Sequence, residues 1–160
     1  MSQALAPKPR VLTSGKNRIA IVASQFNEKY TDALVEFCVD ELSSVMPQAR
    51  VDLIRVPGAY EIPLATKLIL KNENPAAVIC LGVIIEGETA HADLIATSVT
   101  DSLLAMSLQY EVPVIHEVLL VETEEQARAR CLGTELNRGK DAANAAAAMV
   151  EVSRELGRNR

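Results

Sequence analysis

The sequence predicts an α/β domain, a three-layer α/β/α sandwich built around a four-stranded parallel sheet. Short apolar runs rich in Val, Ile and Leu alternate with segments of helical apolar spacing, and this alternation is typical of parallel sheets. The runs contain few polar residues, so we expect helices to cover both faces of the sheet. A chain of 160 residues is long enough for one such domain with a sizeable core.

The first predicted strand covers Arg18–Ser24 and leads to a helix that Thr31 or Asp32 is expected to cap. The second covers Arg50–Val56 and stops at a Pro-Gly turn. The third begins with the apolar run 76–81, and helical spacing follows it to about residue 110. Right-handed crossovers then give a doubly wound arrangement that is similar to the flavodoxin class.

The fourth predicted strand, residues 112–121, carries the polar pair His116 and Glu117 in an apolar run. Polar groups in a strand need partners, so the pair faces either a site or subunit contact, or an edge open to water. The residues alone leave both interpretations open. A capping box at 123–126 opens a short helix, and an alanine-rich helix follows from about 140 to 156.

Residues 1–17 have no apolar period, so we expect a flexible arm or a segment that pairs with a neighbouring chain. A single domain is expected over 18–160. The net charge of −5 without runs of like charge argues against nucleic acid as a partner. No apolar run is long enough for a membrane span and 1–17 lacks a secretory core, which predicts a cytoplasmic protein. The 3 cysteines are far apart and predict reduced, structural thiols.

The stretch 82–93, GVIIEGETAHAD, predicts a strand end, a glycine loop and a helix start. Backbone N–H groups and the positive helix end would meet an anion there, and Gly87 allows close approach. Thr89 supplies a capping hydroxyl, and His91 lies in the first turn, where it can exchange protons with a ligand. Such turns are common in α/β proteins, so the local pattern also fits a histidine that is only a surface or capping residue.

Three further residues have two interpretations each. Phe26 follows the first strand and either stacks on a flat ligand or folds back on the core. Glu61 accepts hydrogen bonds from a ligand or compensates a helix dipole, and Arg130 is a ligand group or a solvated helix charge. Carboxyl ends of parallel strands share one edge, so Phe26, the turn 57–61 and the loop 86–91 should border a single crevice.

The chain resembles the 6,7-dimethyl-8-ribityllumazine synthase family over about residues 18–156. Five motifs together carry the resemblance: QFN, VPGAYEIP, GVIIEGETAHAD, VPVIHEVLLVETEEQARAR and NRGKDAA. The resemblance implies that 5-amino-6-(D-ribitylamino)uracil condenses with 3,4-dihydroxy-2-butanone 4-phosphate, releasing phosphate and water. It implies no metal and no organic cofactor. A homologue that binds a flavin-like ring without turnover is the main alternative. A phosphorylated receiver domain does not fit, because residues 23–25 supply no acidic pair.

The resemblance also assigns roles to individual residues. His91 would be the acid/base. The pyrimidine and ribityl group would contact Phe26, Ala59, Tyr60, Glu61, the backbone of Val83, Ile84 and Ile85, and His116 of an adjoining subunit. The butanone phosphate would contact Glu88, Thr89 and Arg130.

Several positions depart from the family pattern. His116 replaces a common Phe, Glu86 a common Arg, Ala92 an aromatic residue, and Gln25 an Arg. Lost aromatic rings would weaken stacking on the pyrimidine. The family also implies a pentamer, with a shell of twelve pentamers favoured here because no extra residues separate Arg130 from the last helix, and riboflavin synthase as a partner.

Overall fold

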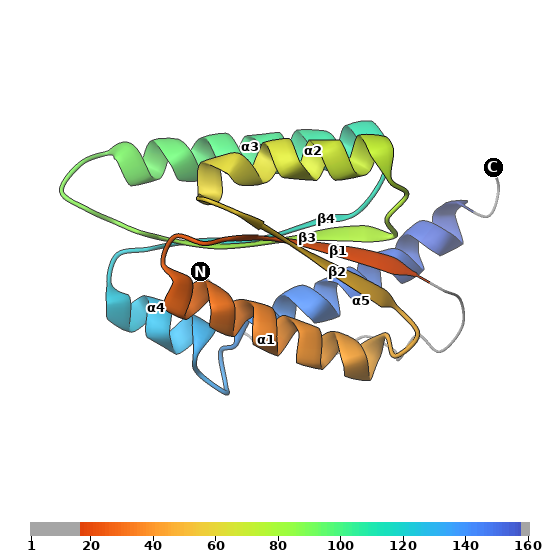
Figure 1. Ribbon diagram of the computed structural model, residues 1–160, viewed down its shortest axis with the longest axis horizontal. Coiled ribbons are helices and arrows are strands. Elements are labelled where there is room, and N and C mark those ends of the chain that lie inside the picture. The colour runs from red at the N-terminus through yellow and green to blue at the C-terminus, as the bar shows by residue number, and fades with distance from the viewer. Residues whose placement is uncertain (1–16, 158–160) are drawn as a thin grey trace.

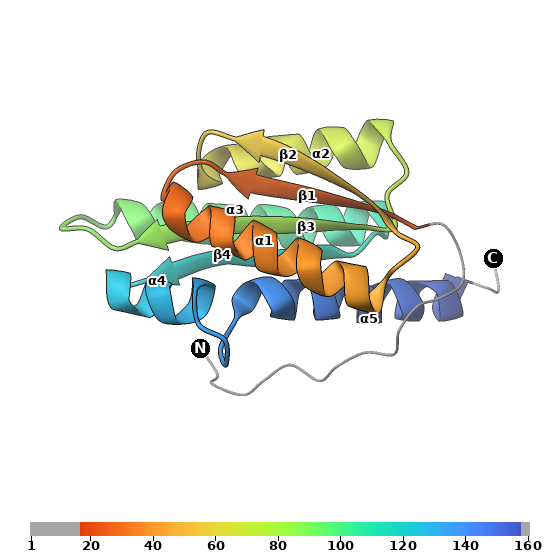
Figure 2. The ribbon, with the colours of Figure 1, turned by 60° about the horizontal axis from the view of Figure 1, so that its bottom comes forward.

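The computed structural model describes residues 17–157 and consists of a parallel four-stranded sheet between two layers of helices (Figure 1). The strands are β1 (Arg18–Ser24), β2 (Arg50–Val56), β3 (Ala77–Ile85) and β4 (Val114–Val121). They lie in the order β2-β1-β3-β4, which Figure 2 shows from top to bottom. The predicted α/β sandwich is therefore confirmed. The expected N-terminal arm lies outside the described residues, apart from Asn17.

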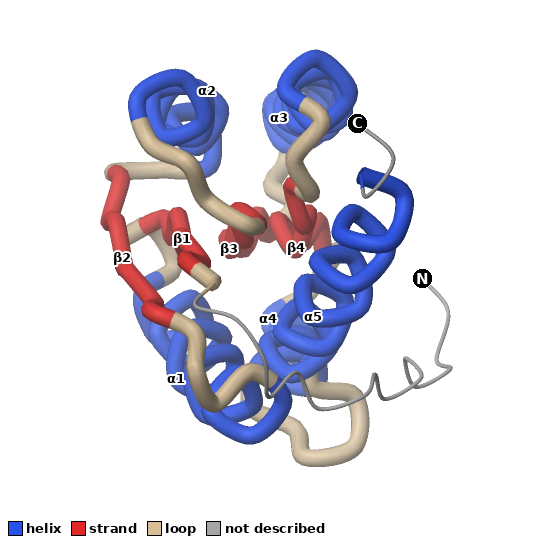
Figure 3. Tube along the Cα trace, turned by 90° about the vertical axis from the view of Figure 1, so that its right-hand side faces the viewer, coloured by secondary structure: helices blue, strands red, loops and turns tan. Residues whose placement is uncertain are grey.

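Helices cover both faces of the sheet, as the end-on view in Figure 3 shows. One face carries α1 (Glu28–Val45), α4 (Glu124–Cys131) and α5 (Arg138–Gly157). The other carries α2 (Ile62–Asn72), preceded by the short 3-10 turn η1 (Ala59–Glu61), and α3 (His91–Tyr110). Of the helices in the described part of the chain, none is long and apolar enough to cross a membrane.

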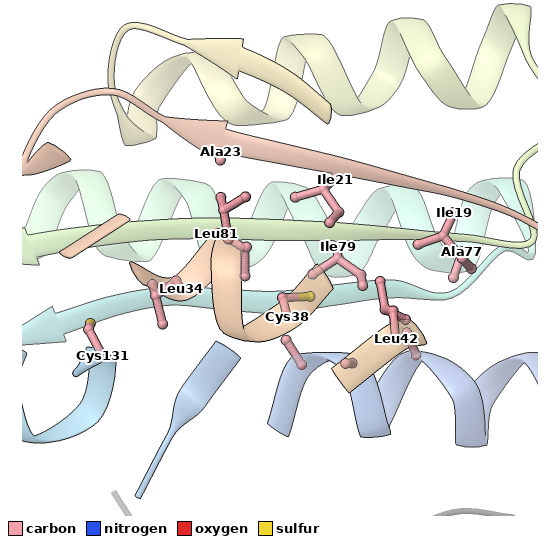
Figure 4. Packing of buried hydrophobic residues seen from close by; sticks show 14 of the residues in the cluster. Ile19, Ile21, Ala23, Leu34, Cys38, Leu42, Ala77, Ile79, Leu81 and Cys131 are labelled. Carbon is pink, nitrogen blue, oxygen red and sulfur yellow. The ribbon is translucent and has the colours of Figure 1, made fainter. Parts of the chain in front are cut away.

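Alternate residues of the central strands fill two separate cores. Ile19 and Ile21 of β1 pack towards α1 and α5, as Figure 4 shows, whereas Ala20 and Val22 pack towards α2 and α3. The period of two in a strand explains this division, and both faces are apolar because both are covered. All three cysteines are buried free thiols, as predicted. Burial raises the pKa of Cys80 to about 12, so this thiol stays protonated.

Two predicted helix caps are wrong. α1 begins at Glu28 after Asn27, and Thr31 lies buried within the helix, where its hydroxyl faces the Asn27 carbonyl at 3.4 Å. α3 begins at His91 after Ala90, with no side-chain cap, so the Thr89 hydroxyl does not cap it. In both cases the loop before the helix, and not the nearest hydroxyl residue, decides where the helix starts.

The predicted capping box before α4 is confirmed. Thr123 Oγ1 accepts a 3.2 Å hydrogen bond from Gln126 N, and Gln126 Oε1 in turn accepts one from Glu122 N at 2.9 Å. These bonds satisfy backbone donors that have no partner inside the helix. They fix the start of α4 at the carboxyl edge of the sheet, the same end as the loop before α3 (Figures 1 and 2).

Candidate functional site

A pocket of about 770 Å³ lies at the carboxyl ends of the strands, where β1 and β3 are neighbours. This is the point where the strand order reverses, which is where ligands bind in doubly wound sheets. Its size is within the usual range for small-molecule sites. The predicted site residues that line it are Phe26, Ala59, Tyr60, Glu61, Val83, Ile84, Ile85, Thr89 and His91. The segments predicted to share one crevice therefore do so.

The loop after β1 brings Phe26 to the pocket. Its backbone is held to the end of β2, because Gln25 N donates to Val56 O at 2.8 Å and Phe26 N to Pro57 O at 3.0 Å. The ring is 73% exposed, so it is not part of the core. Of the two interpretations of this residue, folding back on the core is therefore wrong, and the ring is available to a ligand.

The turn after β2 supplies a second ring and a carboxylate. Tyr60 is 66% exposed, and Glu61 folds back so that its Oε2 lies 3.1 Å from the place of a Cβ on Gly58. The absence of a side chain at Gly58 thus leaves room for the carboxylate over the turn. Glu61 also lies in the single turn before α2 and lines the pocket, where an acceptor can bind hydroxyl or ring N–H groups.

The end of β3 offers backbone groups to the pocket. Pairing with β1 stops at Leu81, but pairing with β4 continues to Ile85. In a parallel strand the N–H and C=O of one residue face the same neighbour, and successive residues alternate. Glu86 N donates to Val121 O of β4 at 2.8 Å, so Ile84 also faces β4, whereas Val83 and Ile85 face the side that β1 has left. The peptide groups of Ile85 are therefore directed at the pocket.

The loop before α3 forms the remaining wall. Gly87, Thr89 and His91 line the pocket, and a methyl group on Gly87 would meet no atom of the chain within 4 Å. The first turn of α3 leaves backbone N–H groups without partners in the helix. Glu86 and Glu88 are exposed and do not line the pocket. The loop therefore combines open backbone, a hydroxyl and an imidazole, and the acidic side chains lie outside the cavity.

Three predicted site residues, Glu88, Arg130 and His116, do not line this pocket. Arg130 lies on α4, where its Nη1 donates to Gln126 O at 3.2 Å. Its Nε is buried and has no hydrogen-bond partner within residues 17–157. The guanidinium is thus held at the carboxyl edge, on the side of the sheet that carries α4.

His116 lies on the edge strand β4 and faces α3. Its Nδ1 accepts a 3.1 Å hydrogen bond from Val118 N, and its Nε2 lies 2.7 Å from Thr100 Oγ1. Because Nδ1 is an acceptor, the proton is on Nε2 and is donated to Thr100. Burial lowers the pKa of His116, so the ring is neutral at pH 7.

Sequence analysis gave no role to three residues that line the pocket, Asn27, Leu94 and Ile95. Leu94 and Ile95 are part of the helical apolar spacing that predicts α3, which favours a place in the core, yet Leu94 is 66% exposed. Their position one helical turn after His91 places Leu94 and Ile95 near the same surface and is the signal that could have found them. Asn27 stands directly after Phe26, but its conformation could not be read from its type.

Exposed rings, a free strand end and an open helix start meet at the carboxyl edge of a doubly wound sheet. These features define an α/β domain with a small-molecule site whose exposed rings suit a flat ligand and whose open helix start suits an anionic group. Residues 16–154 match the family described as 6,7-dimethyl-8-ribityllumazine synthase. The chain belongs to this family.

Curated relatives agree over most of their length. The chain is 43% identical over 143 residues to 6,7-dimethyl-8-ribityllumazine synthase 1 of Caulobacter vibrioides, covering 89% of this chain and 94% of the relative. It is 39% identical over 146 residues to the 6,7-dimethyl-8-ribityllumazine synthase of Coxiella burnetii, covering 91% and 97%. The enzyme of the same name from Stenotrophomonas maltophilia is 38% identical over 140 residues, covering 87% and 90%. The predicted family is confirmed, and with it an enzyme of riboflavin biosynthesis.

Proposed function

We propose that this chain condenses 5-amino-6-(D-ribitylamino)uracil with 3,4-dihydroxy-2-butanone 4-phosphate in the pocket described above, giving 6,7-dimethyl-8-ribityllumazine, phosphate and water. The observation that carries the proposal is the arrangement of a ring platform and an anion-binding loop in one cavity. The uracil is flat and the second substrate carries a phosphate, so each matches one half of the pocket. Holding both substrates together supplies much of the acceleration of a two-substrate reaction.

The pyrimidine half of the site is formed by Phe26, the turn after β2 and the end of β3. The Phe26 ring stacks on the pyrimidine, and the N–H and C=O of Ile85 bond its polar edge. Ala59, Tyr60 and Glu61 contact the ribityl chain, whose hydroxyl groups donate to the Glu61 carboxylate. The exposure of the Phe26 ring and the direction of the Ile85 peptide groups support this placement.

The phosphate half is the loop 86–90 with the start of α3. Backbone N–H groups around Gly87 and Glu88, together with the Thr89 hydroxyl, hold the butanone phosphate. Fixed donors stabilise the charge that develops as the phosphate leaves. The open space around Gly87 supports the proposal, because the chain itself gives no packing reason for a glycine there.

His91 moves protons between these two halves. Imine formation, loss of phosphate and ring closure each transfer a proton, and a neighbouring imidazole can accept and return it. The position of His91 in the pocket wall, between the phosphate loop and Ile95, supports this role.

A second copy of the chain completes the site by supplying Arg130 and His116. Each side chain lies outside its own chain's pocket, and Arg130 carries a buried Nε without a partner in the described chain. Association is also supported by exposed leucines on the outer faces of α2 and α3, namely Leu64, Leu68, Leu94, Leu104 and Leu108. The family forms homo-oligomers in general. For this chain we propose a pentamer that assembles further into a 60-subunit shell in the cytoplasm, where riboflavin synthase would use its product.

Mixing the purified protein with both substrates tests the reaction directly. The lumazine chromophore should appear in proportion to protein concentration and only when both substrates are present. A protein that binds the pyrimidine or the product but forms no chromophore would be a binding protein, and the proposal would be wrong. Light scattering on the untagged protein tests the assembly, and a fully active monomer would exclude a site shared between chains.

A further inference from the structure

Asn27 connects the loop after β1 to the end of β3. Its Nδ2 donates a 2.7 Å hydrogen bond to the carbonyl oxygen of Val83. Its backbone lies in the left-handed region, with φ 57° and ψ 44°. Asparagine tolerates this conformation better than most residues with a side chain. Asn27 therefore combines a backbone geometry and a side-chain donor that few residue types can supply together.

The rest of the loop is attached to the opposite side. Gln25 N and Phe26 N donate to carbonyl groups at the end of β2, and Arg55 Nη1 of β2 donates to Ser24 O at 3.3 Å. Of the hydrogen bonds described for residues 25–27 within 17–157, that of Asn27 is the one that reaches β3. Without it the loop would be hinged at β2 and could move away from the pocket.

The side chain most affected by such a movement is Phe26. Because its ring is 73% exposed, core packing does not fix it, and its place depends on the backbone on either side. The preceding backbone is bound to β2, and the following residue is Asn27. The hydrogen bond from Asn27 to Val83 therefore fixes the position of the Phe26 ring relative to the end of β3.

We infer that Asn27 is a positioning residue, which holds the Phe26 ring over the part of the pocket that takes the flat ligand. This inference rests on the proposed function, because the ligand to be stacked is the pyrimidine or the lumazine formed from it. Asn27 acts through Phe26 and through the loop. Its loss should therefore weaken ring binding and leave binding of the phosphate substrate unchanged.

A double-mutant cycle between Asn27 and Phe26 tests the inference. The probe is 6,7-dimethyl-8-ribityllumazine, titrated by its fluorescence against the assembled protein. Asn27→Asp keeps the size and the tolerance for positive φ, but its carboxylate cannot donate to the Val83 carbonyl. We expect it to bind the probe about tenfold more weakly, the effect of one lost hydrogen bond to a carbonyl that stays in place. Phe26→Ala should also weaken binding, and adding Asn27→Asp to it should cost less than about a further twofold.

Asn72→Asp is the matched control. Asn72 also donates its amide to a carbonyl, Leu68 O at 2.9 Å, but at the exposed end of α2. Its substitution should leave probe binding unchanged. If Asn27→Asp does not assemble, Asn27→Gly retains the positive φ without the side chain and takes its place in the cycle.

Three results would overturn the inference. Wild-type affinity in Asn27→Asp would show that the hydrogen bond from Asn27 to Val83 is not needed for ring binding. A tenfold loss that persists in the Phe26→Ala background would show that Asn27 acts independently of the ring, and unchanged binding in Phe26→Ala would show that no ring is held there. Steady-state kinetics add a second criterion: the KM for the uracil should rise and that for the butanone phosphate should not. A wild-type protein without turnover would instead contradict the proposed function.

Discussion

Glu117 should make the stability of this protein fall as the pH rises from about 4.5 to about 7. The residue lies on β4 and faces Cys38 of α1, Cys131 of α4, and Arg138 and Asp141 of α5. Arg138 forms a 2.9 Å ion pair with Asp141, and both side chains are about 15% exposed. The Asp141 carboxylate therefore already compensates the charge of Arg138, which offsets the burial of Glu117 only in part. Burial is the main cause that raises the pKa of Glu117 from 4.5 to about 7.

The sign of the effect follows from proton binding. Between these two pKa values the folded chain holds a proton on Glu117 that the unfolded chain has lost, so raising the pH favours unfolding. The contribution of Glu117 is fully present below pH 4.5 and is lost as the pH passes about 7. At 1.36 kcal/mol per pKa unit, the loss in unfolding free energy is at most about 3 kcal/mol. For a domain of this size that corresponds to about 6–12 °C in Tm.

Glu117→Gln removes the titration and keeps the shape. We expect the variant to be more stable than the unmodified protein at about pH 8 and to lose this advantage at about pH 5. Thermal unfolding followed by circular dichroism at one protein concentration measures the difference. Glu36→Gln makes the same change at an exposed position of α1, and as the control it should leave Tm unchanged. Parallel curves for Glu117→Gln and the unmodified protein at all pH values would refute the reasoning.

Four further outcomes are expected. His91→Ala should reduce turnover by about 100-fold or less, with substrate affinity retained. General acid–base groups are typically worth about 10²–10⁴-fold, and a reaction that also proceeds slowly unaided should lose no more than the lower end of this range; unchanged kcat would remove His91 from the mechanism. Arg130→Ala should raise the KM for the butanone phosphate about ten- to hundredfold more than that for the uracil, and an equal rise would make Arg130 structural. Gly87→Ala should leave Tm unchanged and raise the same KM, whereas a lower Tm would show a packing role. Gly139→Ala should lower the free energy of unfolding by about 1–3 kcal/mol, because its Cβ would lie 2.5 Å from Leu34 O. An unchanged free energy of unfolding in a denaturant titration would contradict this contact.

Strands were predicted better than helix starts, for a physical reason. β1 and β2 have the predicted bounds. β1 is an apolar run that is buried along nearly its whole length, whereas β2 is a partly exposed edge strand whose end is set by Pro57 and Gly58. Thr31 and Thr89 have the right chemistry for caps, but a cap also needs an extended backbone at that position. The structure instead starts α1 after a left-handed Asn27. That conformation depends on a bond to Val83, which is 56 positions away.

The location of the site could be predicted, but its finer contacts could not. Carboxyl ends of parallel strands share an edge, so topology alone brought Phe26, Glu61 and His91 together. Whether the N–H and C=O of Ile85 stay free for a ligand depends on where β1 ends relative to β3, and sequence does not give that register. The side chain of Arg130 does not line its own chain's pocket, and the site that it would serve depends on how copies of the chain associate.

A site shared between two copies of the chain requires Arg130 of one copy to complete the pocket of its neighbour before the lumazine can form. The test is co-assembly of two impaired variants, assayed at a butanone phosphate concentration below its KM, where both variants alone should have low activity. His91→Ala removes a residue of the pocket and Arg130→Ala removes the contribution of the neighbour. If the site is shared, equal amounts refolded together should form intact sites wherever an Arg130→Ala pocket meets a His91→Ala neighbour, giving about a quarter of the unmodified activity. Activity no higher than the mean of the two variants alone would place Arg130 within its own chain's site and contradict the account.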